Sequence, residues 1–166
     1  MGFADGLSQT VPVRISTKID YALRAMAELA ASDEDRPMKA EYIAGEQDIP
    51  LKFLLAILGE LRRNRLVRSQ RGQGGGYALA RPAKEITLAD VMRAVEGPLA
   101  NVHDESLRDI AYTGAAAGLV DVWKAVRTSL RSVLETTSVA DLAEGRLPKR
   151  IKTLAAEYEE SLKERY

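Results

Sequence analysis

The chain has no cysteine, and its 166 residues include a single histidine, His103. Without a thiol it cannot form a disulfide, a thiolate zinc site or a cysteine-ligated iron–sulfur cluster. One imidazole also leaves little from which to build a histidine metal site or a Ser-His-Asp arrangement. We therefore expect no enzyme activity, no catalytic residue, no metal site and no cofactor.

Long apolar runs are also missing. No stretch reaches the roughly 20 apolar residues that a membrane-spanning helix needs, and residues 1–13 lack the basic start and apolar run of a secretory signal. Aromatic residues make up 5% of the chain, which weakens an interpretation based on stacking of single-stranded bases. We expect a soluble, cytoplasmic protein without membrane contact, with a flexible extension at 1–13.

Acidic residues are absent from 62–71, where five arginines fall within ten residues, and a glycine cluster at 72–76 follows. The formal net charge is zero, yet residues 14–84 carry thirteen Lys and Arg against nine Asp and Glu. Guanidinium groups pair with phosphates and base edges, and glycines let a backbone turn tightly and approach a ligand closely. This segment predicts an edge that binds nucleic acid.

The glycines could instead form the phosphate loop of a nucleotide-binding enzyme. A Walker loop needs Lys and Ser or Thr after its last glycine, but Gly76 is followed by Tyr77. The dinucleotide fingerprint fails as well, because Tyr77 stands where its third glycine belongs. Both loops also follow a strand and open a helix, which is the reverse of the order expected here. The nucleotide-enzyme interpretation is therefore disfavoured.

Hydrophobic periodicity predicts a mainly α-helical fold with one small β-hairpin. The expected helices lie at about 18–31, 39–47, 50–64 and 87–96, with strands at 66–70 and 77–79 on either side of the glycines. Three helices followed by a basic hairpin make a winged helix-turn-helix, whose third helix enters the major groove while the wing contacts backbone or minor groove. The alternative is a helical bundle with a solvated basic third helix, but a bundle does not need the hairpin.

Beyond this domain, assigned to residues 14–98, we expect an irregular segment at 99–118. An apolar stripe then predicts a long helix at 119–136, followed by a short helix at 139–143 and a last amphipathic helix. Residues 119–166 would thus form a C-terminal helical part.

Several motifs resemble those of the Rrf-two (Rrf2) family of bacterial transcription regulators. They are ISTKIDYALRAM at 15–26, IPLKFL at 49–54, LRRNRLVRS at 61–69, RGQGGGYALARP at 71–82, ITLADV at 86–91, EGPL at 96–99 and TSVADL at 137–142. The resemblance covers about residues 14–144. It implies a homodimeric repressor or activator that binds a palindromic operator in double-stranded DNA. The helix at 119–136 would then be the dimerisation helix; the alternative is that its stripe packs within its own chain.

The resemblance also implies site residues. Lys18 and Tyr21 would contact the DNA backbone, Lys39 and Lys52 would lie at the N-termini of the two helix-turn-helix helices, and Arg71 would reach into the minor groove. Helical spacing separately places Lys52, Ala56, Gly59 and Arg63 on one stripe, where small residues permit a close approach. The full candidate DNA-binding set is Lys18, Tyr21, Lys39, Lys52, Leu55, Ala56, Arg63, Arg71, Gly74 and Gly75.

This chain departs from the family pattern in two places. Many relatives have polar residues where Leu55 and Ala56 stand, so contact with thymine methyls or recognition of DNA shape would replace hydrogen-bonded base readout. Cluster-binding members place three cysteines in the segment that corresponds to 99–118, whereas this chain has only His103 there, and one histidine cannot hold a cluster. Iron–sulfur sensing is therefore not carried over.

Without a cluster, three alternatives remain for the signal: a small molecule, a protein partner, or none. Cysteine-free relatives include regulators of sulfur and cysteine metabolism, so the resemblance implies a regulon of that kind. A rival hypothesis is a winged-helix protein-interaction module, or an effector-binding regulator, with little sequence-specific DNA binding. Leu55 and Ala56 are its best support.

Overall fold

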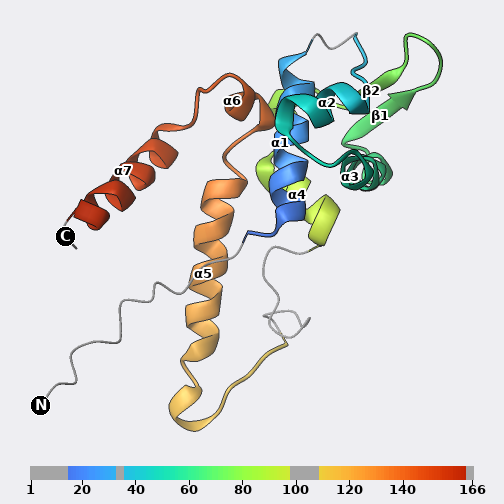
Figure 1. Cartoon of the computed structure of the whole chain (residues 1–166). Helices are drawn as coiled ribbons and strands as arrows, with labels where there is room; N and C mark the ends of the chain where they lie inside the picture. Colours follow the sequence, from blue (N-terminus) through green and yellow to red (C-terminus); the bar gives the residue numbers. More distant parts are fainter. Residues whose placement is uncertain (1–14, 33–35, 98–108, 164–166) are drawn as a thin grey trace, which may run out of the picture.

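The computed structural model describes residues 15–32, 36–97 and 109–163. Its elements are α1 (Thr17–Ala31), α2 (Ala40–Gln47), α3 (Leu51–Arg63), β1 (Val67–Gln70), β2 (Gly76–Leu79), the 3-10 turns η1 (Ala83–Glu85) and η2 (Gly114–Ala116), α4 (Leu88–Glu96), α5 (Leu119–Leu134), α6 (Val139–Ala143) and α7 (Lys149–Lys163). The predicted fold class, mainly helical with one antiparallel hairpin, is confirmed (Figure 1).

Helix α1 forms the centre of the N-terminal domain. Ser16 caps it by accepting a hydrogen bond from the Ile19 amide at 3.2 Å. Its buried side, which includes Met26 and Leu29, contacts α2, α3, α4, α6 and β2. The hydrophobic core is therefore organised around one helix, and the elements that carry the candidate site pack directly on it.

Helices α2 and α3 are joined by a short turn. Asp48 ends α2 in the left-handed conformation, with φ of 49°, and Pro50 precedes the first residue of α3. Between them Ile49 is buried and holds the turn on the core. Helix α3 buries one stripe, which consists of Leu54, Ile57, Leu58 and Leu61. The opposite stripe is left on the surface, as a helix-turn-helix requires.

The hairpin pairs Val67 with Leu79 and Gln70 with Gly76. The outer edge of β2 is also paired, because the Met38 amide donates to the Tyr77 carbonyl at 2.8 Å and the Tyr77 amide donates back at 2.7 Å. This close pairing explains Gly76, since a Cβ there would lie 2.5 Å from the Met38 carbonyl oxygen. The base of the wing is thereby fixed to the segment that leads into α2.

The C-terminal part leaves the core and returns to it. Two similar caps, Thr87 before α4 and Ser138 before α6, lie side by side, where the Leu88 amide donates to the Thr137 carbonyl at 2.9 Å. Helix α6 packs on α1 and buries Val139 in the core. Figure 1 shows α5 extending away from this region.

Element boundaries differ little from those predicted. Helix α2 begins at Ala40 because Lys39 is its N-cap residue. Helix α5 ends at Leu134, two residues early, and the hydroxyl groups of Thr136 and Thr137 donate back to carbonyls of its last turn. Within the segment predicted as irregular, the described part contains the turn η2. The predicted extension at 1–13 and the histidine at position 103 lie outside the described residues.

Candidate nucleic-acid interface

The exposed face of α3 carries four of the predicted site residues. Lys52, Ala56 and Arg63 are exposed on it, and the Leu55 side chain is 44% exposed. Gly59 lies between them and is half-buried. The predicted stripe therefore exists as one continuous surface, with a cation at each end.

The C-terminal end of α3 is linked to the wing. Arg62 donates a hydrogen bond from Nη1 to the Ser69 hydroxyl on β1 at 3.1 Å. Arg63 reaches back over Gly59, where a Cβ would lie 3.8 Å from its Nη1. The arginine-rich segment thus joins the recognition-helix position to the hairpin, and both lie on one side of the molecule (Figure 1).

The wing tip exposes Arg71 and Gly74 but buries Gly75. The Gly75 amide donates to the Gly72 carbonyl at 3.0 Å, and a Cβ on Gly75 would overlap the carbonyl of Gln70. Glycine is required at this position because the turn folds back on its own backbone. Gly75 therefore shapes the tip, whereas Arg71 is on its surface.

The two predicted residues on α1 are already engaged. Lys18 forms an ion pair with Glu60 of α3, with 2.8 Å between Nζ and Oε2. Tyr21 is half-buried against the core, and the Arg24 guanidinium lies 5.4 Å from its ring centroid. Sequence reasoning missed Glu60, although it is the only acidic residue in α3 and stands on the side that faces α1. Lys18 is adjacent to the α3 surface, but its charge is balanced there.

Lys39 lies at the opposite end of the helix-turn-helix. It is exposed, and as the N-cap residue of α2 it makes no capping hydrogen bond through its side chain. Its neighbour Met38 is the residue that pairs with β2. Lys39 therefore lies in the same segment that pairs with β2 of the wing.

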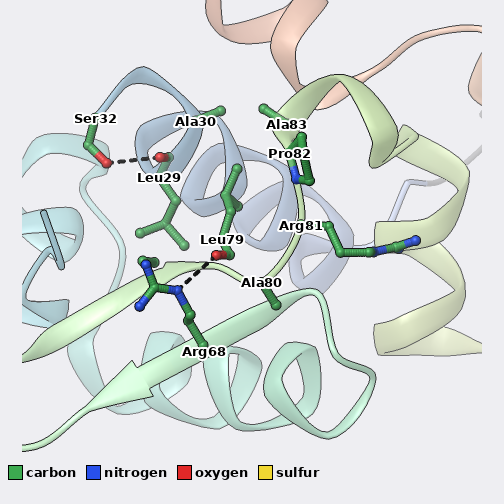
Figure 2. Close-up of a pocket in the computed structure, with 10 residues that line it drawn as sticks. Leu29, Ala30, Ser32, Arg68, Leu79, Ala80, Arg81, Pro82 and Ala83 are labelled. Carbon is green, nitrogen blue, oxygen red and sulfur yellow. Dashed lines mark hydrogen bonds between the residues drawn. The ribbon is translucent and has the colours of Figure 1, made fainter. Parts of the chain in front are cut away.

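A cavity of about 230 Å³ lies behind the wing, between the hairpin, the end of α1 and the segment after β2. Figure 2 shows Arg68 of β1 at this cavity, donating from Nε to the Leu79 carbonyl at 3.3 Å. Arg81 extends away toward α4 (Figure 2), where its guanidinium lies 3.9 Å from the Asp90 carboxylate. The first contact joins the two strands at the base of the hairpin, and the second links the segment after β2 to α4.

Two carboxyl groups among the described residues have a lowered pKa, and both lie at helix ends away from α3. Hydrogen bonds from Arg131 and then Arg93 lower the pKa of Glu135. Hydrogen bonds from the Ser138 side chain and backbone lower the pKa of Asp141 in the capping box of α6. Both pKa values are lowered by ion pairs or hydrogen bonds that hold helix ends together, so neither carboxyl group indicates an acid–base site.

A helix-turn-helix followed by a basic hairpin defines the class of winged helix-turn-helix DNA-binding proteins. Within that class, the family model for Rrf2, described as an iron-dependent transcriptional regulator, matches residues 15–145. The chain belongs to the Rrf2 family of transcriptional regulators and is not an enzyme. The predicted resemblance is thereby confirmed.

The relatives agree with this assignment. A Mycobacterium tuberculosis protein classed by name as an HTH-type transcriptional regulator is 50% identical over 146 residues, which cover 88% of this chain and 91% of the relative. The HTH-type transcriptional regulator CymR of Bacillus subtilis is 34% identical over 79% of this chain and 90% of its own. The solved structure of CymR, named there as the global cysteine regulator of B. subtilis, covers 80% of this chain and 98% of its own with a TM-score of 0.68.

The family description refers to iron, and the residues of this chain do not fit an iron–sulfur cluster. The sequence contains no cysteine, and cluster ligation depends on thiolates. Over 15–32, 36–97 and 109–163, no group of His, Asp and Glu side chains is placed to hold a metal ion.

In the same ranges, no helix is both long and apolar enough to cross a membrane.

Proposed function

We propose that the chain acts as a homodimeric repressor or activator that binds a palindromic operator without an iron–sulfur cluster. The observation that carries this proposal is the direct connection of α3 to the wing. The Arg62–Ser69 hydrogen bond holds the end of α3 to β1, and the Met38–Tyr77 pairing holds β2 to the start of α2. One surface then presents a helix for the major groove and a hairpin for the minor groove.

The proposed contacts follow from position and charge. Lys39 and Lys52 lie at helix N-termini, where backbone amides also attract phosphates. Arg63 would contact a phosphate or a base edge, and Arg71 would enter the minor groove. Gly74, exposed at the tip, would let the wing backbone approach the DNA, and the predicted contact at Gly75 would be indirect, because this buried glycine shapes the turn. Lys18 would exchange its Glu60 partner for a phosphate, and Tyr21 would contact the backbone beside it.

The dimer proposal rests on α5. None of its residues is buried in the single chain, and its apolar stripe includes Val122, Val126 and Leu130, which are 53%, 44% and 37% exposed. The alternative, in which the stripe packs within its own chain, is disfavoured by this exposure. A second copy would cover the stripe, and two-fold symmetry would place two winged helices on half-sites roughly 34 Å apart.

The domain division at residues 98 and 118 remains part of the proposal, with 119–166 as the dimerisation helix and C-terminal helices. Because α6 packs on α1, the C-terminal part would also transmit conformational changes from the dimer interface to the core. Cytoplasmic location follows from a role in transcription. The signal would be a small molecule, a protein partner or none, and the likeness to CymR favours genes of sulfur and cysteine metabolism.

A band-shift with DNA from the protein's own promoter tests the proposal. We expect a discrete complex that survives an excess of random duplex and weakens as salt rises. Arg63→Ala should weaken it, whereas Arg146→Ala, which removes an exposed arginine near α6, should not. Binding equal to that of random DNA, or none at low salt, would instead support the protein-interaction module.

A further inference from the structure

The centre of the α3 surface lacks hydrogen-bonding side chains. Between Lys52 and Arg62 this face carries the exposed Leu55 and Ala56 and the half-buried Gly59, and Phe53, which follows Lys52, adds an apolar side chain that is 64% exposed. Polar side chains return on this face at Arg62 and Arg63. Lys52 and Arg63 are separated by eleven helical steps, or roughly 16 Å. Cations therefore mark the two ends of a short apolar patch, made of Leu55, Ala56 and Gly59.

The polar groups that border this patch are committed elsewhere. Glu60 pairs with Lys18 on α1 at 2.8 Å, and Arg62 donates to Ser69 on the wing at 3.1 Å. Asn64, just beyond the helix, donates from its side chain to the carbonyls of Glu60 and Ala94. None of these groups is placed to replace the missing donors and acceptors at the centre of α3.

Leu55 itself has no structural reason to be exposed. It is 44% exposed, whereas Leu54 and Leu58 on the other side of the same helix are fully buried. An exposed leucine side chain contributes hydrophobic free energy only when a partner removes it from water. In the major groove, the one apolar group on a base edge is the C5 methyl of thymine.

We propose that α3 reads its operator through thymine methyl groups, with Leu55 and Ala56 as the specificity-determining residues and the terminal cations on phosphates. This inference rests on the proposed operator binding. Each half-site would present thymines to the apolar patch, and Gly59 would let the helix approach closely enough for contact. Cytosine, which has a hydrogen at the same position, would leave Leu55 in water or against a polar amino group.

Replacing thymine by deoxyuridine tests this directly, because the two bases differ only by the methyl group. The full-length protein would first select its preferred site from a random duplex library, and each thymine of that site would then be replaced singly. We expect one or two thymines in each half-site to lose about fourfold in affinity per methyl removed. Replacements outside the half-sites should have no effect.

Leu55→Ala identifies the residue that reads the methyl. In this variant, thymine and deoxyuridine should bind equally at the position that Leu55 contacts, because the side chain that contacts that methyl is gone. Arg71→Ala is the matched control: it should lower affinity for both duplexes and keep the fourfold ratio. Leu55 is on the surface, so the thermal unfolding of Leu55→Ala should match that of the parent protein.

The outcomes separate the two proposals. A selected site that tolerates deoxyuridine everywhere would overturn methyl readout while leaving operator binding intact, and would indicate recognition of DNA shape. A ratio that persists at every sensitive position in Leu55→Ala would also overturn the role of this residue. Failure to select any sequence would overturn both proposals, since an apolar reader of thymine must prefer thymine.

Discussion

Arg71 and Lys18, two predicted DNA contacts, differ in whether their charge already has a partner in the protein. Lys18 is paired with Glu60, so binding a phosphate means giving up an existing ion pair. Arg71 is exposed at the wing, and no carboxylate in the described ranges pairs with it. A charge without a partner loses no protein contact on binding. Arg71 should therefore contribute more to affinity than Lys18.

Replacing Arg71 by alanine should weaken operator binding about tenfold and reduce the salt dependence of binding by about one ion. The dimer should be unaffected because Arg71 lies on the wing, far along the chain from α5. Fluorescence anisotropy across a salt series measures the first effect, and light scattering checks the second. Arg146→Ala serves as the control for a lost surface charge. Unchanged affinity would remove Arg71 from the DNA-binding site.

A capping box formed by Ser138 and Asp141 begins helix α6 at the point where the chain packs again on the core. Ser138 donates to Asp141 from its hydroxyl at 2.7 Å and from its amide at 2.9 Å. The Asp141 amide donates back to the Ser138 hydroxyl at 3.0 Å. The cap of α4 lies beside it and has the same design. These caps hold the point where the chain returns from α5 to the core.

The lowered pKa of Asp141 predicts how the stability of this cap depends on pH. Its carboxylate is charged in both states at neutral pH, so its full contribution is present above the ordinary pKa of about 3.9. As the pH falls through the lower pKa of the folded protein, the carboxylate is protonated and the contribution is lost. Asp141→Asn should cost roughly 1 kcal/mol at pH 7 and less at pH 2, where more of the Asp141 carboxylate is protonated in the folded protein.

Urea unfolding of both proteins at the two pH values checks this prediction. The comparison between variant and parent cancels the effect of Glu135, the other carboxyl with a lowered pKa. Ser138→Ala should instead lower stability at both pH values, because the Ser138 hydroxyl accepts from the Asp141 amide whatever the charge on the carboxylate. A difference between Asp141→Asn and the parent that is equal at both pH values would contradict the assignment.

The sequence predicted the elements well because each carries its own local signal. Apolar spacing marks α3, and Ser138 marks the start of α6. The pairing of Met38 with Tyr77 had no such signal, because it depends on backbone hydrogen bonds between distant segments. The Lys18–Glu60 ion pair escaped prediction for the same reason. Charge and periodicity therefore predicted helix α3 and the hairpin as elements, whereas tertiary contacts decide which side chains on them already form an ion pair or hydrogen bond.

At the scale of the whole molecule, the chain is divided between a packed domain and an uncovered helix. Helices α1 to α4 and α6 share one core, while α5 extends from it with its apolar stripe exposed (Figure 1). The winged-helix part therefore has a core of its own, and in the proposed dimer its folding would not depend on the second copy. Losing the dimer should reduce operator binding without unfolding the domain.

Val126→Glu tests this separation, since it places a charge in the middle of the exposed stripe. We expect a monomer by light scattering, an unchanged helical circular dichroism spectrum, and at least a hundredfold weaker binding to the full operator because the two half-sites are no longer bound together. Thr128→Glu adds the same charge to the same helix, on the side opposite the stripe, and should stay dimeric. If both variants remain dimeric, or both become monomeric, the α5 stripe is not the dimer interface.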